Sequence, residues 1–128
     1  MIGSEVRPAL RVHGALSRGA FALAVLVSLV VLFVPSSDVP YSPPGVDKIV
    51  HASLFAALAL TGRWAGMAQV ALASVLVLYA AASEVIQGLI GRDAAVGDLL
   101  ADVVGVFLGL LLWHWLSRRA ARVPDRLA

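Results

Sequence analysis

Long apolar runs fill most of this 128-residue chain and limit the folds that it can adopt. Two of them, residues 67–90 and 95–116, contain only three charged side chains between them, all acidic. An α-helix of about 20 residues crosses the hydrocarbon core of a bilayer. Hydrophobic residues make up 60% of the chain, which is more than a small soluble domain can bury. The sequence therefore predicts a single all-α membrane domain.

Four membrane-spanning helices are expected, at about residues 17–34, 47–62, 67–90 and 95–116. The loop between the first two holds four prolines, which exclude helix there. We expect residues 19–116 to form an integral membrane four-helix bundle, flanked by basic tails at residues 1–18 and 117–128. A cleaved signal peptide is the alternative reading of the first segment, although Pro35 makes a poor cleavage site.

The basic residues indicate how these helices are oriented. Eight of the ten Lys and Arg residues lie in the two tails or at Arg63, between the second and third helices. Lys48 and Arg92 lie toward the opposite side. Because cytoplasmic loops are enriched in basic residues, we expect both termini in the cytoplasm and a multi-pass protein of the cell (plasma) membrane. The net charge of +2 without a clustered basic face argues against nucleic-acid binding.

Ionisable and amide side chains occur where three of these helices approach the extracytoplasmic side. They are Asp47, Lys48 and His51 on the second helix, Glu84 and Gln87 on the third, Arg92 in the next loop, and Asp98 and Asp102 on the fourth. A rise of about 1.5 Å per residue keeps all of them in the outer third of the membrane. Ionisable groups inside spanning segments are costly, so their shared layer predicts one polar site.

Helical spacing gives the acidic residues of the fourth helix a common direction. Asp98, Asp102, Gly105 and Gly109 follow one another by four, three and four residues and so share one face. Gly105 and Gly109 offer the small surface at which helices approach each other closely in lipid. The two acidic side chains are therefore expected to point into the bundle, in line with a helix-packing face.

Purely structural roles are the alternative for several of these residues. Asp47 could only cap the second helix, and Asp98 could only interact with the dipole of the fourth. Lys48 and Arg92 could simply extend their charges to the membrane interface.

The ordered set of motifs resembles the VanZ-like family of small bacterial membrane proteins. The resemblance is carried by Asp47-Lys48-x-x-His51 with Phe55, Glu84-x-x-Gln87, Arg92 with Asp98, and Gly105-x-x-x-Gly109, within residues 20–116. Family members often have Asn where this chain has Asp102. The resemblance implies an α-helical integral membrane protein of the bacterial cell envelope. Founding members are linked to glycopeptide (teicoplanin) resistance, and the family has no agreed biochemical activity.

Two functional hypotheses follow. In the first, the site engages an anionic envelope lipid or its head group, and whether it is an enzyme is left open. The candidate catalytic residues are His51, Glu84, Asp98 and Asp102, and the candidate binding residues are Asp47, Lys48, Gln87 and Arg92. His51 would carry a proton and Glu84 would act as acid or base. In the second, the protein is a non-catalytic accessory that changes the access of glycopeptide antibiotics or the response to envelope stress.

The expected partners are membrane lipids, with an envelope lipid precursor or a glycopeptide-related ligand as the candidate ligand. A metal site is the weakest hypothesis, because the chain has no local ligand spacing such as H-E-x-x-H. No metal and no cofactor is therefore expected.

Overall fold

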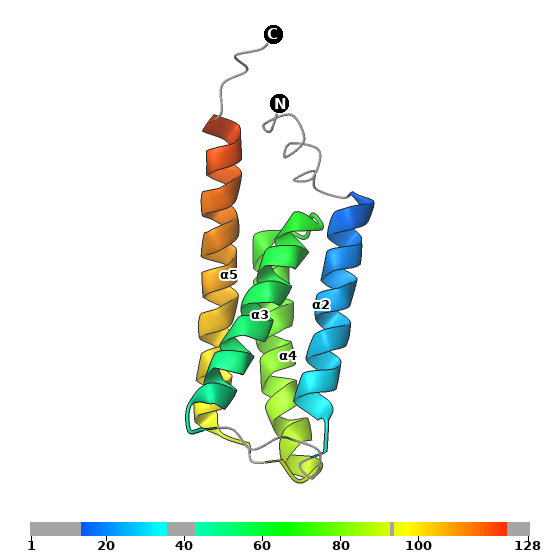
Figure 1. The fold of residues 1–128 in the computed structure, drawn as a ribbon, viewed down its shortest axis with the longest axis vertical. Coiled ribbons are helices and arrows are strands. Elements are labelled where there is room, and N and C mark those ends of the chain that lie inside the picture. The colour runs from blue at the N-terminus through cyan, green and yellow to red at the C-terminus, as the bar shows by residue number, and fades with distance from the viewer. Residues whose placement is uncertain (1–13, 36–42, 93, 123–128) are drawn as a thin grey trace.

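The computed structural model describes residues 14–35, 43–92 and 94–122, which form four α-helices (Figure 1). The helices are α2 (Ala15–Phe33), α3 (Val46–Trp64), α4 (Gln69–Leu89) and α5 (Val96–Arg122). Within these ranges there is no β-strand, so the expected all-α fold is confirmed. The expectations for residues 1–13 and 123–128 lie outside the described residues.

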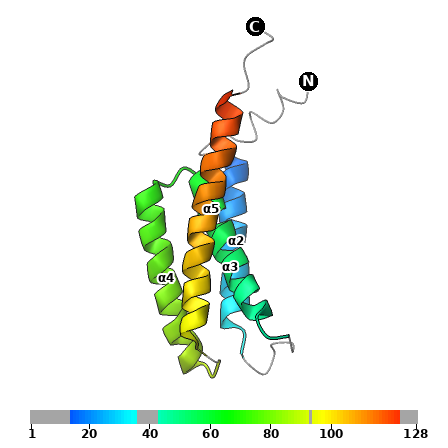
Figure 2. The same cartoon turned by 90° about the vertical axis from the view of Figure 1, so that its left-hand side faces the viewer.

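Successive helices run in opposite directions and pack side by side (Figures 1 and 2). The C-terminal ends of α2 and α4 and the N-terminal ends of α3 and α5 therefore lie at one end of the molecule. We call it the proline-loop end, because the proline-rich loop of the sequence joins α2 to α3 there. The candidate site residues come from these helix ends, so the topology brings them to one region.

Three of the four helices, α2, α4 and α5, are long and apolar enough to cross a membrane. α3 is as long as α2, with 19 residues each, but it carries Asp47, Lys48 and Arg63. It packs against all three other helices, and its exposed large apolar side chains all lie at or before Val50. Beyond Val50 the other helices therefore cover most of α3, in contrast to the exposed apolar faces of α2, α4 and α5.

The core lies between the helices and draws on all of them. Its buried apolar residues are Leu32, Phe55, Leu58, Ala59, Leu72, Leu76, Ala80, Val106 and Leu110. The outer faces of α2, α4 and α5 also carry apolar side chains: Leu23, Leu78 and Phe107 are 62%, 69% and 61% exposed. Exposure of such apolar surfaces to water is unfavourable, whereas contact with lipid chains is not. The distribution of apolar residues therefore indicates a membrane protein.

α5 is longer than the sequence predicts. The expected end lies near Leu116, but the helix continues to Arg122, so residues 117–122 are also helical. The guanidinium carbon of Arg119 lies 4.0 Å from the ring centre of Trp115, one turn earlier. Arg119 and Arg122 also occupy the last turn, where basic side chains interact favourably with the helix dipole. These interactions stabilise the additional turns.

The start of α3 differs from the suggested Asp47 cap. Gly45 is the N-cap residue, its φ is 89°, and no side chain caps the helix through a hydrogen bond. This left-handed backbone suits glycine because glycine has no Cβ. Asp47 instead accepts a hydrogen bond of 3.4 Å from Nζ of Lys48. A capping role for Asp47 is therefore wrong.

Candidate functional site

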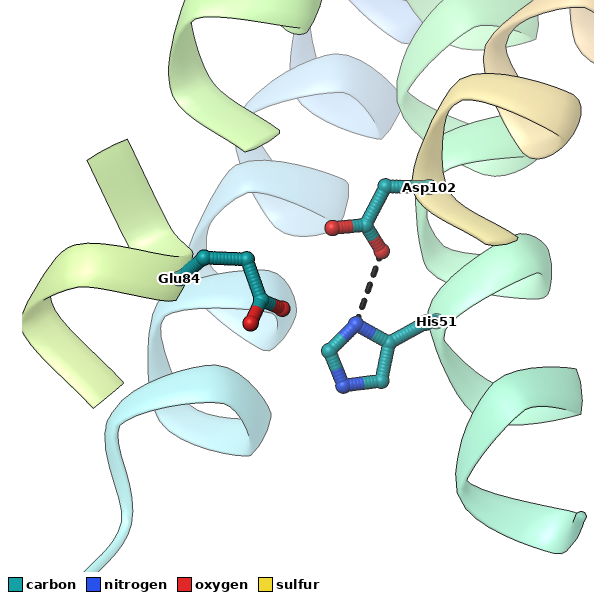
Figure 3. A group of neighbouring side chains, drawn as sticks. All are labelled: His51, Glu84 and Asp102. Carbon is teal, nitrogen blue, oxygen red and sulfur yellow. Dashed lines mark hydrogen bonds and ion pairs between the residues drawn. The ribbon is translucent and has the colours of Figure 1, made fainter. Parts of the chain in front are cut away.

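A histidine and an aspartate form the centre of the candidate site. Nδ1 of His51 on α3 lies 2.7 Å from Oδ1 of Asp102 on α5 (Figure 3). The two residues are 4% and 0% exposed. With Asp102 ionised, its carboxylate only accepts hydrogen bonds, so Nδ1 of His51 then carries the hydrogen and donates it. This bond fixes the orientation of the imidazole ring and leaves Nε2 on the side of the ring away from Asp102.

The close approach of α3 and α5 makes this short bond possible. A Cβ added at Gly105 would overlap the carbonyl oxygen of Ala52, and one added at Gly109 would overlap that of Ala56. Backbone carbonyls cannot move aside as flexible side chains do, so only glycine fits at these two positions. Ala52 directly follows His51 in the chain, so the glycine contact sets the separation of the helices at the His–Asp pair.

Glu84 supplies a third acidic or basic group from α4. Its Oε2 accepts a hydrogen bond of 3.1 Å from the backbone N–H of Ala95, directly before the start of α5. Its carboxylate faces the His51–Asp102 pair (Figure 3). One ligand-type atom from each of His51, Glu84 and Asp102 lies within 4.8 Å of the other two. We call these three residues the HED cluster.

Two oxygens of the HED cluster are buried without a hydrogen-bond partner in the described part of the chain. They are Oε1 of Glu84 and Oδ2 of Asp102. Buried polar atoms are nearly always paired, because an unpaired one loses its hydration without compensation. The cluster therefore has capacity to bind a proton donor or a cation in addition to the bonds that it already makes.

Asp98 forms a second group with Lys48 and Asp47, one helical turn from Asp102 of the HED cluster. Nζ of Lys48 donates to Oδ1 of Asp98 over 3.2 Å and to Oδ2 of Asp47 over 3.4 Å. The Lys48 side chain is 48% exposed, whereas that of Asp98 is 7% exposed. Asp98 precedes Asp102 by one turn of α5, toward the proline-loop end. This ion pair thus forms an outer charged layer above the buried cluster.

Arg92 and Gln87 bind the C-terminal end of α2. Nη1 of Arg92 donates to the carbonyl oxygens of Val31 and Leu32, at 2.8 and 3.0 Å. Nε2 of Gln87 also donates to the oxygen of Leu32, at 3.0 Å. The last carbonyls of a helix have no partners within the helix and need donors from elsewhere. The structure therefore uses two of the expected binding residues to hold the end of α2.

A mostly apolar groove of about 450 Å³ runs between α4 and α5 and has Glu84 in its lining. The other lining residues are Val85, Gly88, Leu89, Ala94, Ala95, Val96 and Leu99. Val85, Leu89 and Val96 are 65%, 81% and 76% exposed. The groove therefore connects a carboxylate of the HED cluster with an outer apolar surface.

The architecture and the site define a class: an all-helical protein with apolar outer faces and a buried His–Asp–Glu cluster at one end of its helices. No protein-family model, curated protein or solved structure matches the chain. Its function is therefore argued from the sequence pattern and from the geometry of the site.

Proposed function

We propose that this chain is a VanZ-like multi-pass protein of the bacterial plasma membrane that binds an anionic lipid of the cell envelope. The observation that carries the proposal is the α4–α5 groove, which is apolar along its length and lined by Glu84 of the HED cluster. A lipid has the same two parts, an apolar chain and a polar head. With its chain along this apolar surface, the head group would lie at the proline-loop end, beside Lys48 and near the cluster.

Lys48 supports the choice of an anionic head group. Its aliphatic chain lies against Gly97, the residue that follows Val96 of the groove. Its ammonium group is half exposed and lies at the proline-loop end of α3. A phosphate oxygen would form a charge-assisted hydrogen bond with this group and would compete with Asp98 for it. Lys48 is therefore the proposed recognition residue for the charge of the lipid.

The His51–Asp102 pair gives the site a means of moving a proton. Asp102 holds Nδ1–H of His51, and Nε2 of such a ring is left to accept or donate a proton. Hydrolysis or transfer at a lipid phosphate is the reaction class that this arrangement would serve. Basic side chains at the opposite end of the helices, such as Arg119 and Arg122, support an extracytoplasmic position of the site.

The test uses purified full-length protein in nanodiscs. Binding of a polyprenyl phosphate, a polyprenyl pyrophosphate and a neutral polyprenol is compared, and release of phosphate is followed in the same samples. We expect the two phosphorylated lipids to bind at least about tenfold more tightly than the alcohol, since one charge-assisted hydrogen bond contributes about 1.5–3 kcal/mol. Lys48→Ala should remove most of that difference.

A matched control is His114→Ala, which removes an exposed histidine on α5. His51→Ala should reduce any phosphate release, whereas His114→Ala should not. Equal binding of the alcohol and the phosphorylated lipids would refute the proposal. Selective binding without phosphate release would instead favour the non-catalytic accessory role.

A further inference from the structure

We infer that His51, Glu84 and Asp102 bind one divalent transition-metal cation, of the type of Zn²⁺ or Mn²⁺. This inference goes beyond lipid binding, and the metal site does not depend on the proposed lipid-binding function. The three residues come from three different helices, α3, α4 and α5, and present one ligand-type atom each within 4.8 Å of one another. Figure 3 shows their side chains turned toward a common region.

The distances fit a first coordination shell after a small adjustment. Imidazole nitrogens and carboxylate oxygens bind zinc at about 2.0–2.2 Å, so two ligands of one ion lie at most about 4.4 Å apart. In a tetrahedral shell they lie about 3.3–3.6 Å apart, so atoms within 4.8 Å of each other need to draw together by about an ångström. Glu84 can make this movement by rotating its flexible side chain.

The buried oxygens without partners supply the second, independent argument. Asp102 is 0% exposed, yet its Oδ2 has no hydrogen-bond partner among the described residues, and Oε1 of Glu84 is in the same situation. In Figure 3 the free oxygen of Asp102 lies on the side that faces Glu84. A cation between them would coordinate both oxygens, and Nδ1 of His51 would join them after losing the hydrogen that it donates to Asp102 in the metal-free protein.

The negative charges of the two carboxylates also favour a bound cation. Two carboxylates near one another in a poorly solvated region need a nearby positive charge or a proton. Lys48 binds Asp98 and Asp47, and Arg92 donates to backbone carbonyls of α2. The contacts of these two basic residues thus lead away from the HED cluster. A divalent cation would balance the charges of Glu84 and Asp102 directly.

The donor set selects the class of cation. One imidazole with two carboxylates suits Zn²⁺ or Mn²⁺, whereas Ca²⁺ takes six to eight oxygens. Three protein ligands leave at least one coordination position open, as in catalytic zinc sites. If the proposed function is correct, a phosphate oxygen of the lipid would take that position; this last step alone depends on the proposed function.

The experiment uses full-length protein in detergent, stripped with a chelator and free of added lipid. Zn²⁺ and Mn²⁺ are titrated by calorimetry, and elemental analysis gives the metal content after dialysis. We expect about one ion per chain. His51→Ala, Glu84→Gln and Asp102→Asn should each weaken binding at least about tenfold, whereas His114→Ala should bind like the parent protein.

The titration of the parent protein is decisive even if a variant fails to fold. Absence of stoichiometric binding of both ions would overturn the inference. So would binding that all three cluster variants retain, because the ion would then lie elsewhere. Since no lipid is present, metal binding and lipid binding can fail independently of each other.

Discussion

At the scale of single residues, Asp102 has the most constrained environment in the site. It is fully buried, bonds His51 through one oxygen and leaves the other without a partner among the described residues. An asparagine has nearly the same shape and can still accept a hydrogen bond from Nδ1 of His51 through its amide oxygen. An alanine removes the acceptor and leaves the histidine N–H buried and unpaired.

We therefore expect Asp102→Asn and Asp102→Ala to differ in stability. With a chelator present, Asp102→Asn should change the free energy of unfolding by less than about 1 kcal/mol, whereas Asp102→Ala should cost about 1–3 kcal/mol. Thermal unfolding in detergent measures both. Equal destabilisation by the two substitutions would mean that the negative charge, and not the hydrogen bond, holds the pair together.

The residue scale also shows where prediction from the sequence succeeds. The sequence places His51, Glu84 and Asp102 in one layer because helix spacing and alternating direction determine depth. It does not identify Ala95 as the partner of Glu84, because this bond uses the backbone N–H, which does not depend on the type of side chain. For the same reason it treats Arg92 as a binding residue, although Arg92 donates to backbone carbonyls of α2. Contacts of side chains with backbone atoms can be identified only in the three-dimensional structure.

At the scale of helices, the α3–α5 contact determines the geometry of the site. Gly105 lies against the backbone of α3 at Ala52, one residue after His51. A methyl group there would push the helices apart, and Asp102 would then reach His51 less well. Gly19 on α2 offers a control, because nothing lies within 4 Å of the position that its Cβ would take.

Gly105→Ala is therefore expected to destabilise the protein by about 1–3 kcal/mol through overpacking. Gly19→Ala should cause no loss and should stabilise α2 by up to about 1 kcal/mol, since alanine favours helix more than glycine does. Thermal unfolding of the two variants under one set of conditions makes the comparison. A Gly105→Ala protein as stable as Gly19→Ala would show that the two helices can separate without cost.

The positions of the helices themselves follow well from the sequence. Apolar runs and proline or glycine breaks place three of the four helices within about two residues of their ends. The exception is α5, because the sequence after Leu116 is basic and resembles a tail. Arginine, leucine and alanine are nevertheless good helix formers, and Arg119 over Trp115 adds a contact along the helix surface. Composition alone does not separate a charged helix from a charged tail.

At the scale of the whole molecule, the orientation in the membrane determines whether the HED cluster lies toward the exterior or toward the cytoplasm. The start of α2 and the C-terminal end of α5 lie at the end opposite the proline-loop end (Figure 1). Arg118, Arg119 and Arg122 lie near that end of α5, and the positive-inside rule puts such residues in the cytoplasm. The HED cluster would then lie toward the exterior, with access to lipids of the outer leaflet.

This orientation can be tested with single cysteines, because the chain has none of its own. Ser37→Cys, in the proline-rich loop of the sequence, should react with a membrane-impermeant maleimide in intact cells. Ala121→Cys, at an exposed position near the end of α5, should react only after the cells are permeabilised. The reverse pattern would place the cluster on the cytoplasmic side. A lipid ligand would then have to come from the inner leaflet, and a role in the access of extracellular glycopeptides would lose its physical basis.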